Sequence, residues 1–328
     1  MEKTFPKNFG LLEERQINPK DYRAGGISGL DRVVLREDGD YRKFLPTIEY
    51  QVGTYFDTMA CVTFSALNCL ETIANIRNWR FFNRSDRFTA KMSGTTKNGN
   101  YLSKVADSIA VNDGTVDEDT WPYPRLQREP VFDWNDFYAD IPENVKIEGR
   151  RFLKDYDVGH EWVSVYELRE MLKYGPIQVT VQAWPHPNAN GMYENRGSDH
   201  SYNHAVELVY MGDDYCEIYD HYDKVNKRLV PDYKFGAAKR FELKKIDPNS
   251  IEPTPMITLP NNCLVQMTGE GANGAFALHL DGKLLIDEPE KVFGSWAMRS
   301  SDFSNKRSIT REEWDSFPHF NLKMESID

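Results

Sequence analysis

The distribution of apolar and polar residues predicts one strong helix early in the chain. Between residues 57 and 78, apolar or small side chains recur every three or four positions, as on one buried helix face. Asp57 or Thr58 is expected to cap its first turn, because a side-chain oxygen there accepts from unpaired backbone N–H groups. Two shorter helices are predicted over residues 101–112 and 163–174.

The patterns further along the chain are those of strands. Residues 177–184 alternate apolar and polar side chains, as a half-buried strand does. Residues 205–220 consist of two strand-like runs around a polar turn and predict a β-hairpin. Residues 120–150 contain several prolines and are predicted to be loop-like.

The two ends of the chain differ from its middle. Residues 1–45 are polar and turn-rich, which is typical of a lead segment rather than a domain. Closely spaced prolines indicate a linker over residues 251–261. Short strand-like runs in residues 262–328 predict a small β-rich module, so the main domain is expected over residues 46–250.

Composition excludes several classes of function. The chain has 328 residues and a net charge of −11, which argues against binding to nucleic acid or to an anionic membrane surface. The sequence has neither a membrane-spanning apolar run nor a signal peptide, so no membrane insertion is expected, and the expected location is the cytoplasm or a phage particle. The four cysteines lack zinc-site spacing and are interpreted as reduced thiols, with no metal and no cofactor expected.

Cys61 is a candidate nucleophile. It lies in the first turn of the strongest predicted helix, where the partial positive charge of the helix N-terminus favours a thiolate. Nucleophilic catalysis by cysteine also needs a base and a third group that orients the base. The alternative is an inert buried cysteine, which is the more common state of a free cysteine.

The predicted hairpin supplies candidates for the base and its partner. With a turn near residues 212–213, His204 faces Asp220 across the two strands, and such a pair can share a hydrogen bond. The alternative is an ordinary polar pair at a sheet end. His200 and His204 have the spacing of a zinc pair, but the sequence lacks the glutamate of that motif, so no metal site is expected.

Together these segments resemble the papain-like cysteine peptidases, in particular their bacterial and phage-encoded members, over about residues 45–245. The matching motifs occur in the family's order. They are CVTFSA at 61–66, NGNY at 98–101, GPIQVTVQA at 175–183, GMY at 191–193 and NHAVELVY at 203–210.

The resemblance implies an α+β papain-like fold, with a helical lobe that carries the nucleophile and an antiparallel sheet that carries the histidine. It implies that Cys61 is the nucleophile, His204 the general acid and base, and Asp220 the residue that orients His204. The other implied roles are oxyanion stabilisation by Gln51, substrate binding by Gly99, Asn100 and Tyr101, and shielding of the His–Asp pair by Tyr222.

The chain departs from the family pattern at several of these positions. Asp220 stands where the family usually has asparagine, Asn100 replaces a glycine, and Tyr222 replaces a shielding tryptophan. A further departure is Val62, which follows the nucleophile where the family has tryptophan. Gln51 also lies ten residues before the nucleophile instead of about six, so Thr58 or a backbone N–H is the alternative oxyanion donor.

Three functions are compatible with these residues. The leading hypothesis is a thiol peptidase acting on a polypeptide, or on peptidoglycan peptides if the C-terminal module directs it to a cell surface. The second is a weak or inactive papain-like protein of a phage particle or other assembly, with the C-terminal module contacting a partner. The third is acyl transfer to an amine, which differs from hydrolysis in its product.

Overall fold

The computed structural model describes residues 9–14, 30–52, 56–79, 82–123, 133–222 and 226–246, together with the backbone of five strands beyond residue 262. The chain forms two compact units, Met1–Ile246 and Asp247–Asp328. The described parts of residues 1–45 belong to the first unit, and Tyr41 is fully buried in its core. The predicted linker at 251–261 lies outside the described residues.

The first unit contains a six-stranded sheet with the order β1-β6-β2-β3-β4-β5, in which all neighbouring strands are antiparallel. The strands are β1 (Tyr156–Trp162), β2 (Ile177–Val181), β3 (His204–Met211), β4 (Cys216–Tyr219), β5 (Asn226–Leu229) and β6 (Ala238–Lys245). The predicted strand after residue 176 and the predicted hairpin are confirmed. The central strand β2 is buried along its whole length, as its β-branched apolar residues favour.

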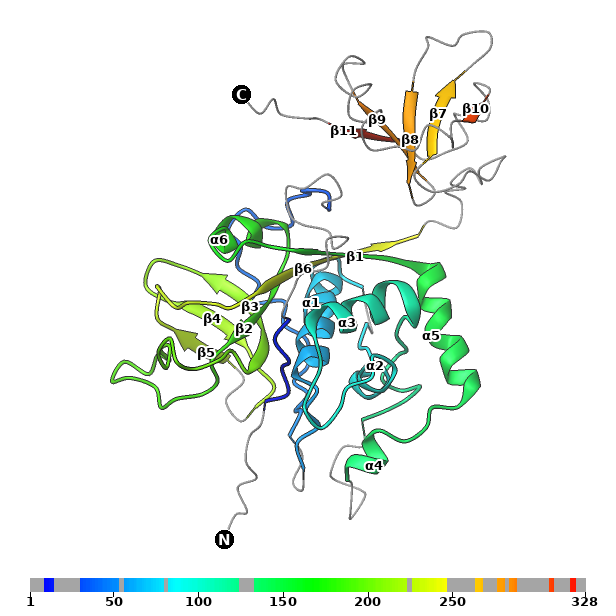
Figure 1. Ribbon diagram of the computed structural model, residues 1–328. Helices are drawn as coiled ribbons and strands as arrows, with labels where there is room; N and C mark the ends of the chain where they lie inside the picture. Colours follow the sequence, from blue (N-terminus) through cyan, green and yellow to red (C-terminus); the bar gives the residue numbers. More distant parts are fainter. Residues whose placement is uncertain are drawn as a thin grey trace. The chain divides into compact units, whose positions relative to one another are not determined.

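Helix α1 (Cys61–Ile76) is the predicted early helix, and Figure 1 shows it between the sheet and the other helices. Every residue from Cys61 to Ala74 is buried, which makes it the central helix of the unit. The predicted cap is wrong, because the helix begins after Ala60 without a side-chain cap. Asp57 instead accepts hydrogen bonds from the backbone N–H of Met59 and from the side-chain amide of Gln51.

The remaining helices are shorter, and they include α2 (Asp86–Met92). The predicted helix at 101–112 is confirmed as α3 (Leu102–Asp107) and a π-helical turn (Ser108–Asn112). The predicted loop at 120–150 is wrong, since it contains α4 (Trp134–Phe137) and the start of α5 (Glu143–Asp155). Pro142 occupies the N-cap of α5, where a proline does not break a helix. The predicted helix at 163–174 is reduced to α6 (Leu168–Met171) and a 3₁₀ turn (Leu172–Tyr174).

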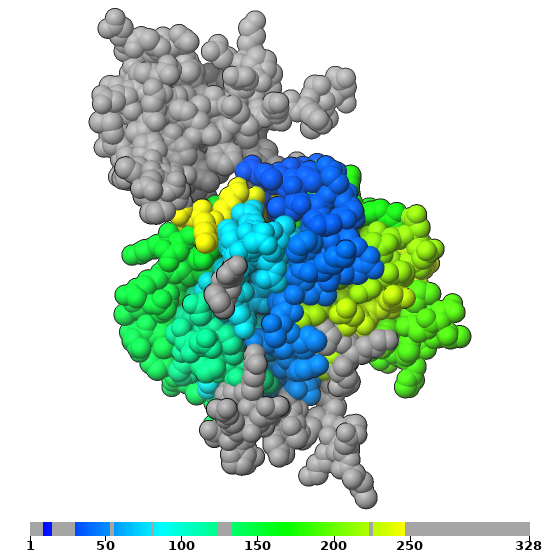
Figure 2. Space-filling model, turned by 180° about the vertical axis from the view of Figure 1, so that it is seen from behind, coloured from blue at the N-terminus to red at the C-terminus, as the bar shows by residue number. Residues whose placement is uncertain are grey.

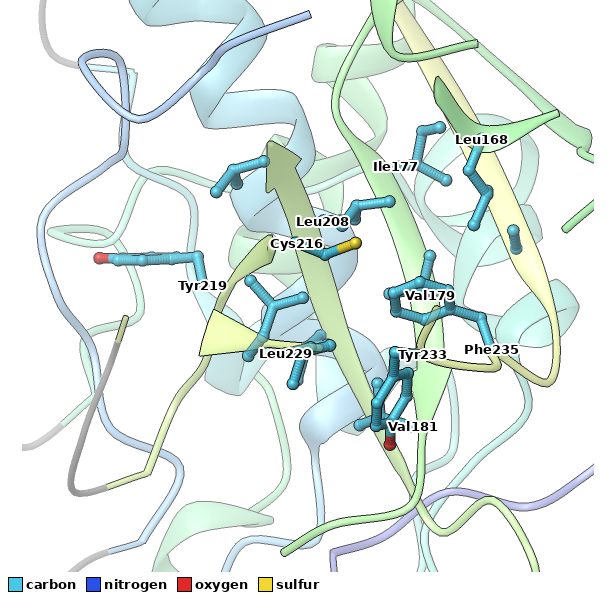
Figure 3. Close-up of a cluster of buried hydrophobic side chains, with 14 of the residues drawn as sticks. Leu168, Ile177, Val179, Val181, Leu208, Cys216, Tyr219, Leu229, Tyr233 and Phe235 are labelled. Carbon is cyan, nitrogen blue, oxygen red and sulfur yellow. The ribbon is translucent and has the colours of Figure 1, made fainter. Parts of the chain in front are cut away.

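Apolar cores lie on both faces of the sheet. The core in Figure 3 gathers residues of β2 and β3 such as Val179 and Leu208 with Tyr233 and Phe235. The second core joins α1 and α3 to the other face of the sheet. Seen from behind in Figure 2, residues 30–52, in blue, lie between the helices and the strands. Since both faces are covered, polar groups on the inner strands must find partners inside the protein.

The second unit has a five-stranded sheet with the order β10-β7-β8-β9-β11. Its strands are β7 (Cys263–Met267), β8 (Phe276–Leu280), β9 (Lys283–Asp287), β10 (Arg307–Ile309) and β11 (His319–Leu322). The three predicted strand-like runs are β7 to β9, and the predicted role in assembly stays a prediction. Across the described ranges of the chain, no helix has the length and apolar character needed to span a membrane.

Candidate active site

Cys61 is the first residue of α1, so its side chain lies beside the backbone N–H groups of the first helical turn. The side chain has no exposed area, and a backbone hydrogen bond links its thiol to Ala205. Burial raises the pKa of the Cys61 thiol well above its ordinary value and outweighs the opposing effect of that hydrogen bond. The described conformation therefore holds a protonated thiol, in contrast to the thiolate that a helix N-terminus favours.

The structure brings His204 and Asp220 together. Nε2 of His204 lies 2.7 Å from Oδ1 of Asp220, and neither side chain has any exposed area. The predicted register of the hairpin is nevertheless wrong, because Glu207 pairs with Tyr219 after a register shift within β3. Asp220 follows the last residue of β4, and its side chain rather than a facing backbone position makes the contact.

Asp220 has two further partners that the sequence analysis missed. Nζ of Lys227 lies 2.5 Å from Oδ2, and the indole N–H of Trp184 donates to the same oxygen at 2.8 Å. Burial alone would raise the pKa of Asp220, but His204 and Lys227 outweigh it and hold that pKa well below its ordinary value. The alternation of exposed and buried residues along β5 is a sequence pattern that indicates a buried Lys227, because Lys227 lies on the same face of the strand as Leu229.

Tyr222 and Gln51 form a polar cluster beside the imidazole. The Tyr222 ring packs against the His204 ring with centroids 5.1 Å apart, and its hydroxyl donates to Asp57 at 2.6 Å. Nε2 of Gln51 donates to Tyr222 at 2.8 Å and to Asp57 at 2.9 Å. Gln51 thus lies next to the site despite its long spacing from Cys61, with both amide hydrogens engaged.

The loop of Gly99, Asn100 and Tyr101 lies at the start of α3. Asn100 is buried, and its Nδ2 donates to the hydroxyls of Ser93 and Thr95 at 3.0 and 3.1 Å. Because these bonds turn the side chain inward, the backbone N–H and C=O of Asn100 remain available to another chain segment. Tyr101 is partly exposed and forms the N-cap of α3.

Residues 9–14, which we call the N-terminal segment, pair with this loop. The N–H of Asn100 donates to the Gly10 carbonyl at 3.0 Å, and the Asn100 carbonyl accepts from the N–H of Leu12 at 2.9 Å. The pairing is parallel. Gly99 has a φ of +96°, and a Cβ there would lie 1.8 Å from the Gly10 carbonyl oxygen, so this close approach requires glycine.

The N-terminal segment also contacts the sheet side of the site, and Figure 1 draws it in the darkest blue between the sheet and α1. The ring of Phe9 lies 5.3 Å from that of His204, and the Phe9 carbonyl oxygen lies 3.4 Å from Nδ1 of His204. The N–H of Leu11 donates to the Asn203 carbonyl at 3.3 Å. This segment belongs to the predicted lead, residues 1–45, and no pattern in the sequence indicates these contacts.

Within the described ranges, no group of three or more His, Cys, Asp or Glu side chains could hold a metal ion. His200, which has zinc-pair spacing to His204, pairs with Asp199 at 3.0 Å. The two histidines therefore have separate acidic partners.

No protein-family model and no curated protein sequence matches this chain. The cysteine protease and lectin-like domains of Cwp84, a surface layer associated protein of Clostridium difficile, are similar in structure, with 13% identity and a TM-score of 0.50 over 66% of this chain and 54% of that one. The chain thus matches about half the length of that structure. The similarity shows that the first unit has the α+β papain-like fold that the sequence predicted.

Two other solved structures are similar at lower scores. Digestive procathepsin L 3 of the Tenebrio molitor larval midgut is 17% identical, with a TM-score of 0.46 over 67% of this chain and 74% of that one. The Carica candamarcensis cysteine protease CMS1MS2, solved in complex with E-64, is 17% identical, with a TM-score of 0.43 over 61% of this chain and 95% of that one.

Proposed function

We propose that the chain is a thiol peptidase that hydrolyses peptide bonds through an acyl-enzyme on Cys61. The observation that carries the proposal is the buried 2.7 Å contact between His204 and Asp220, together with the hydrogen bond that links the Cys61 thiol to the backbone of Ala205, the residue after His204. Since Asp220 occupies Nε2 of His204, Nδ1 is the nitrogen that can exchange a proton with the thiol. The backbone groups of Asn100 pair with the backbone of Gly10 and Leu12, and recognition of a polypeptide uses backbone pairing of this kind.

In the proposed reaction, the thiol of Cys61 gives its proton to Nδ1 of His204, and the thiolate attacks the carbonyl carbon of the scissile bond. The C–S bond forms while the carbonyl π electrons move onto oxygen. When the tetrahedral intermediate collapses, the C–N bond breaks and the imidazolium protonates the leaving amine. Water then adds to the thioester with His204 as base, and C–S cleavage releases the acid and restores the thiol.

The negative charge that develops on the substrate oxygen needs hydrogen-bond donors. The backbone N–H of Cys61 lies in the first turn of α1, whose N–H groups have no partner within the helix. Gln51 is the second donor in this proposal. Both of its amide hydrogens already have acceptors, Asp57 and Tyr222, so Gln51 acts only after exchanging one of these bonds.

We further propose that the N-terminal segment keeps the site covered. The segment uses the backbone groups of Asn100 that a substrate would use, and its Phe9 carbonyl faces the nitrogen of His204 that the thiol would use. A peptide substrate therefore competes with the chain's own residues. The full chain is expected to be slow until this segment moves away.

Two glutamates hold the N-terminal segment from opposite sides. Glu13 accepts from the backbone N–H of Tyr202, near the start of β3, at 2.9 Å. Glu14 accepts from the backbone N–H of Ser103, in the first turn of α3, at 2.7 Å. A carboxylate at a helix N-terminus is stabilised by the helix dipole, so the second contact favours the covered state.

Labelling of the full chain with E-64, mapped by mass spectrometry, tests both proposals. We expect selective label on Cys61 and its loss in Cys61→Ala. Gly10→Ala should accelerate labelling, because a Cβ there would lie 2.2 Å from the Met59 carbonyl oxygen and displace the segment. Gly191→Ala is the matched control, since Gly191 has the same φ of +75° with nothing within 4 Å of its Cβ position.

Each outcome separates the hypotheses. Equal slow labelling of Cys61, Cys69 and Cys216 in every variant would contradict the peptidase and favour a papain-like protein that acts through binding. Fast labelling of the unmodified chain, unchanged by Gly10→Ala, would contradict the covering role alone. For an active protein, products with a free carboxylic acid indicate hydrolysis, and products joined to an added amine indicate acyl transfer.

A further inference from the structure

The carboxylate of Asp220 accepts two hydrogen bonds on each oxygen. Oδ1 accepts from Nε2 of His204 and from the backbone N–H of His221, each at 2.7 Å. Oδ2 accepts from Nζ of Lys227 at 2.5 Å and from Nε1 of Trp184 at 2.8 Å. One oxygen therefore faces the proposed base, and the other faces the amino group of Lys227.

The second oxygen and its partners are shielded from solvent. The side chains of Asp220 and Lys227 are 0% and 4% exposed, so their ion pair is screened little by water. Nζ of Lys227 lies 5.3 Å from the centroid of the Trp184 ring, which adds a cation–π contact. The same indole meets the His204 ring edge-on at 6.0 Å. Trp184 thus contacts all three charged or titratable members of this cluster.

We propose that Lys227 is a positioning residue that cancels the charge of Asp220, so that the Asp220–Lys227 pair acts on His204 as a neutral hydrogen-bond acceptor. The proposal rests on the proposed function, in which His204 exchanges protons with the thiol and the leaving amine. An uncompensated carboxylate would favour the imidazolium at every stage and make it a weaker acid toward the amine. The neutral pair orients the ring without this bias.

Charge compensation by Lys227 also explains how an aspartate can stand at a position where the papain-like family, which the chain resembles, usually has asparagine. A neutral asparagine amide offers a carbonyl oxygen to the imidazole without adding charge. Asp220 offers a carboxylate oxygen, and Lys227 removes the additional charge through the other oxygen. Trp184 fixes the orientation of the carboxylate by donating to that second oxygen.

The other titratable groups around His204 do not replace Lys227. Among the residues that the structure describes, they are His221 at a ring distance of 6.2 Å, Tyr222 at 5.1 Å, Asp57 behind the Tyr222 hydroxyl, and the Cys61 thiol. Burial lowers the pKa of His221 to about 3 and raises that of Tyr222 well above its ordinary value, so both are neutral near pH 7. The paired strand β2 and the N-terminal segment present Val181 and the Phe9 carbonyl, which carry no charge.

A charge cycle in the full chain tests the proposal. The pH midpoint of His204 protonation is followed by NMR with labelled histidine, and its signal is assigned by its loss in His204→Gln. Lys227→Gln should raise the midpoint by about one to two pH units, and Asp220→Asn should lower it by a similar amount. The double variant should return to within about half a unit of the unmodified chain, because both charges are gone.

Opposite signs distinguish charge compensation from a packing defect. Single variants that shift the midpoint in the same direction, or a double variant that stays shifted, would overturn the proposal. Lys227→Arg is the matched control that keeps the charge and should leave the midpoint in place. If the Lys227→Gln single variant does not fold, the double variant is compared with the Asp220→Asn single variant. The pH midpoint of His204 must then be higher in the double variant.

The midpoint is measured without substrate, so it does not depend on peptidase activity. If the single and double variants shift the midpoint as expected but E-64 does not label the chain, the proposed function is contradicted and the role of Lys227 is supported. A chain that is labelled but shows no opposite shifts would keep the proposed function and overturn the role of Lys227.

Discussion

The two sides of the proposed site use different groups. The helical side contributes Cys61 at the start of α1 and the loop of Gly99 and Asn100, and its contacts with the N-terminal segment use backbone N–H and C=O groups. The sheet side contributes His204 and Asp220, whose contact is made by titratable side chains without exposed area. One side therefore depends on the course of the backbone, and the other depends on charge.

Substitutions have different consequences on the two sides. Asn100 replaces a glycine of the resembling family, and its side chain turns inward while its backbone still pairs. Asp220 replaces an asparagine, and this adds a buried charge that Lys227 and Trp184 contact. A backbone group tolerates a new side chain, whereas a buried charge requires a partner from elsewhere in the fold.

The largest expected effect is on the free energy of unfolding, and it compares the loss of one member of the Asp220–Lys227 ion pair with the replacement of both. Asp220→Ala should lower the free energy of unfolding by about 3 to 5 kcal/mol, because it removes one member of a buried ion pair and keeps the other. The double variant Asp220→Asn with Lys227→Gln should lose much less, since no unpaired charge remains. Urea unfolding of both proteins checks this, and equal losses would show that the charge of the pair is unimportant.

The second prediction concerns acid stability. Since the folded-state pKa of Asp220 is depressed, its contribution is present above its unfolded pKa near 4 and is lost as pH falls through the lower folded value. This loss should be about 2 to 3 kcal/mol. Urea unfolding at a series of pH values from 6 to 2 should show a shallower acid decline in the double variant. If the free energy of unfolding declines equally in the double variant and in the unmodified chain, groups other than Asp220 cause the loss of stability in acid.

A smaller effect is expected on the helical side. Asn100→Ala should lower the free energy of unfolding by about 1 to 2 kcal/mol, because the hydroxyls of Ser93 and Thr95 lose a donor. E-64 labelling of Cys61 should keep its rate, since the backbone contacts of Asn100 with Gly10 and Leu12 remain. A strong acceleration would mean that the Asn100 side chain, rather than its backbone, holds the N-terminal segment.

The smallest expected effect is that of Trp184→Phe. The change keeps an aromatic ring beside His204 but removes the N–H that donates to Asp220. A loss of about 1 kcal/mol in the free energy of unfolding is expected, because Oδ2 keeps its contact with Lys227. A loss as large as that of Asp220→Ala would show that Trp184, not Lys227, is the main partner of the carboxylate.

Local patterns predicted some elements well and others poorly. The helix that begins at Cys61 and the hairpin of β3 and β4 follow from periodicity and turn residues, which act over a few positions. The prolines of residues 120–150 predict a loop where α5 forms, because proline is typical of loops, whereas Pro142 precedes the helix as its N-cap. The predicted hairpin register is wrong by two residues because Met211 pairs with Cys216, so the turn is centred later in the chain than the polar residues near 212–213 indicate.

The sequence by itself determined the helix that begins at Cys61, the strand that begins at His204 and the strand that ends just before Asp220, because hydrophobic periodicity and turn chemistry are local. Only the tertiary structure decided that Lys227 and Trp184 meet the carboxylate and that residues 9–14 contact Asn100 and His204. These contacts join segments far apart in the chain, and they depend on sheet order and on the cost of burying charge. That cost depends on all the neighbours of a group in space, which no short stretch of sequence specifies.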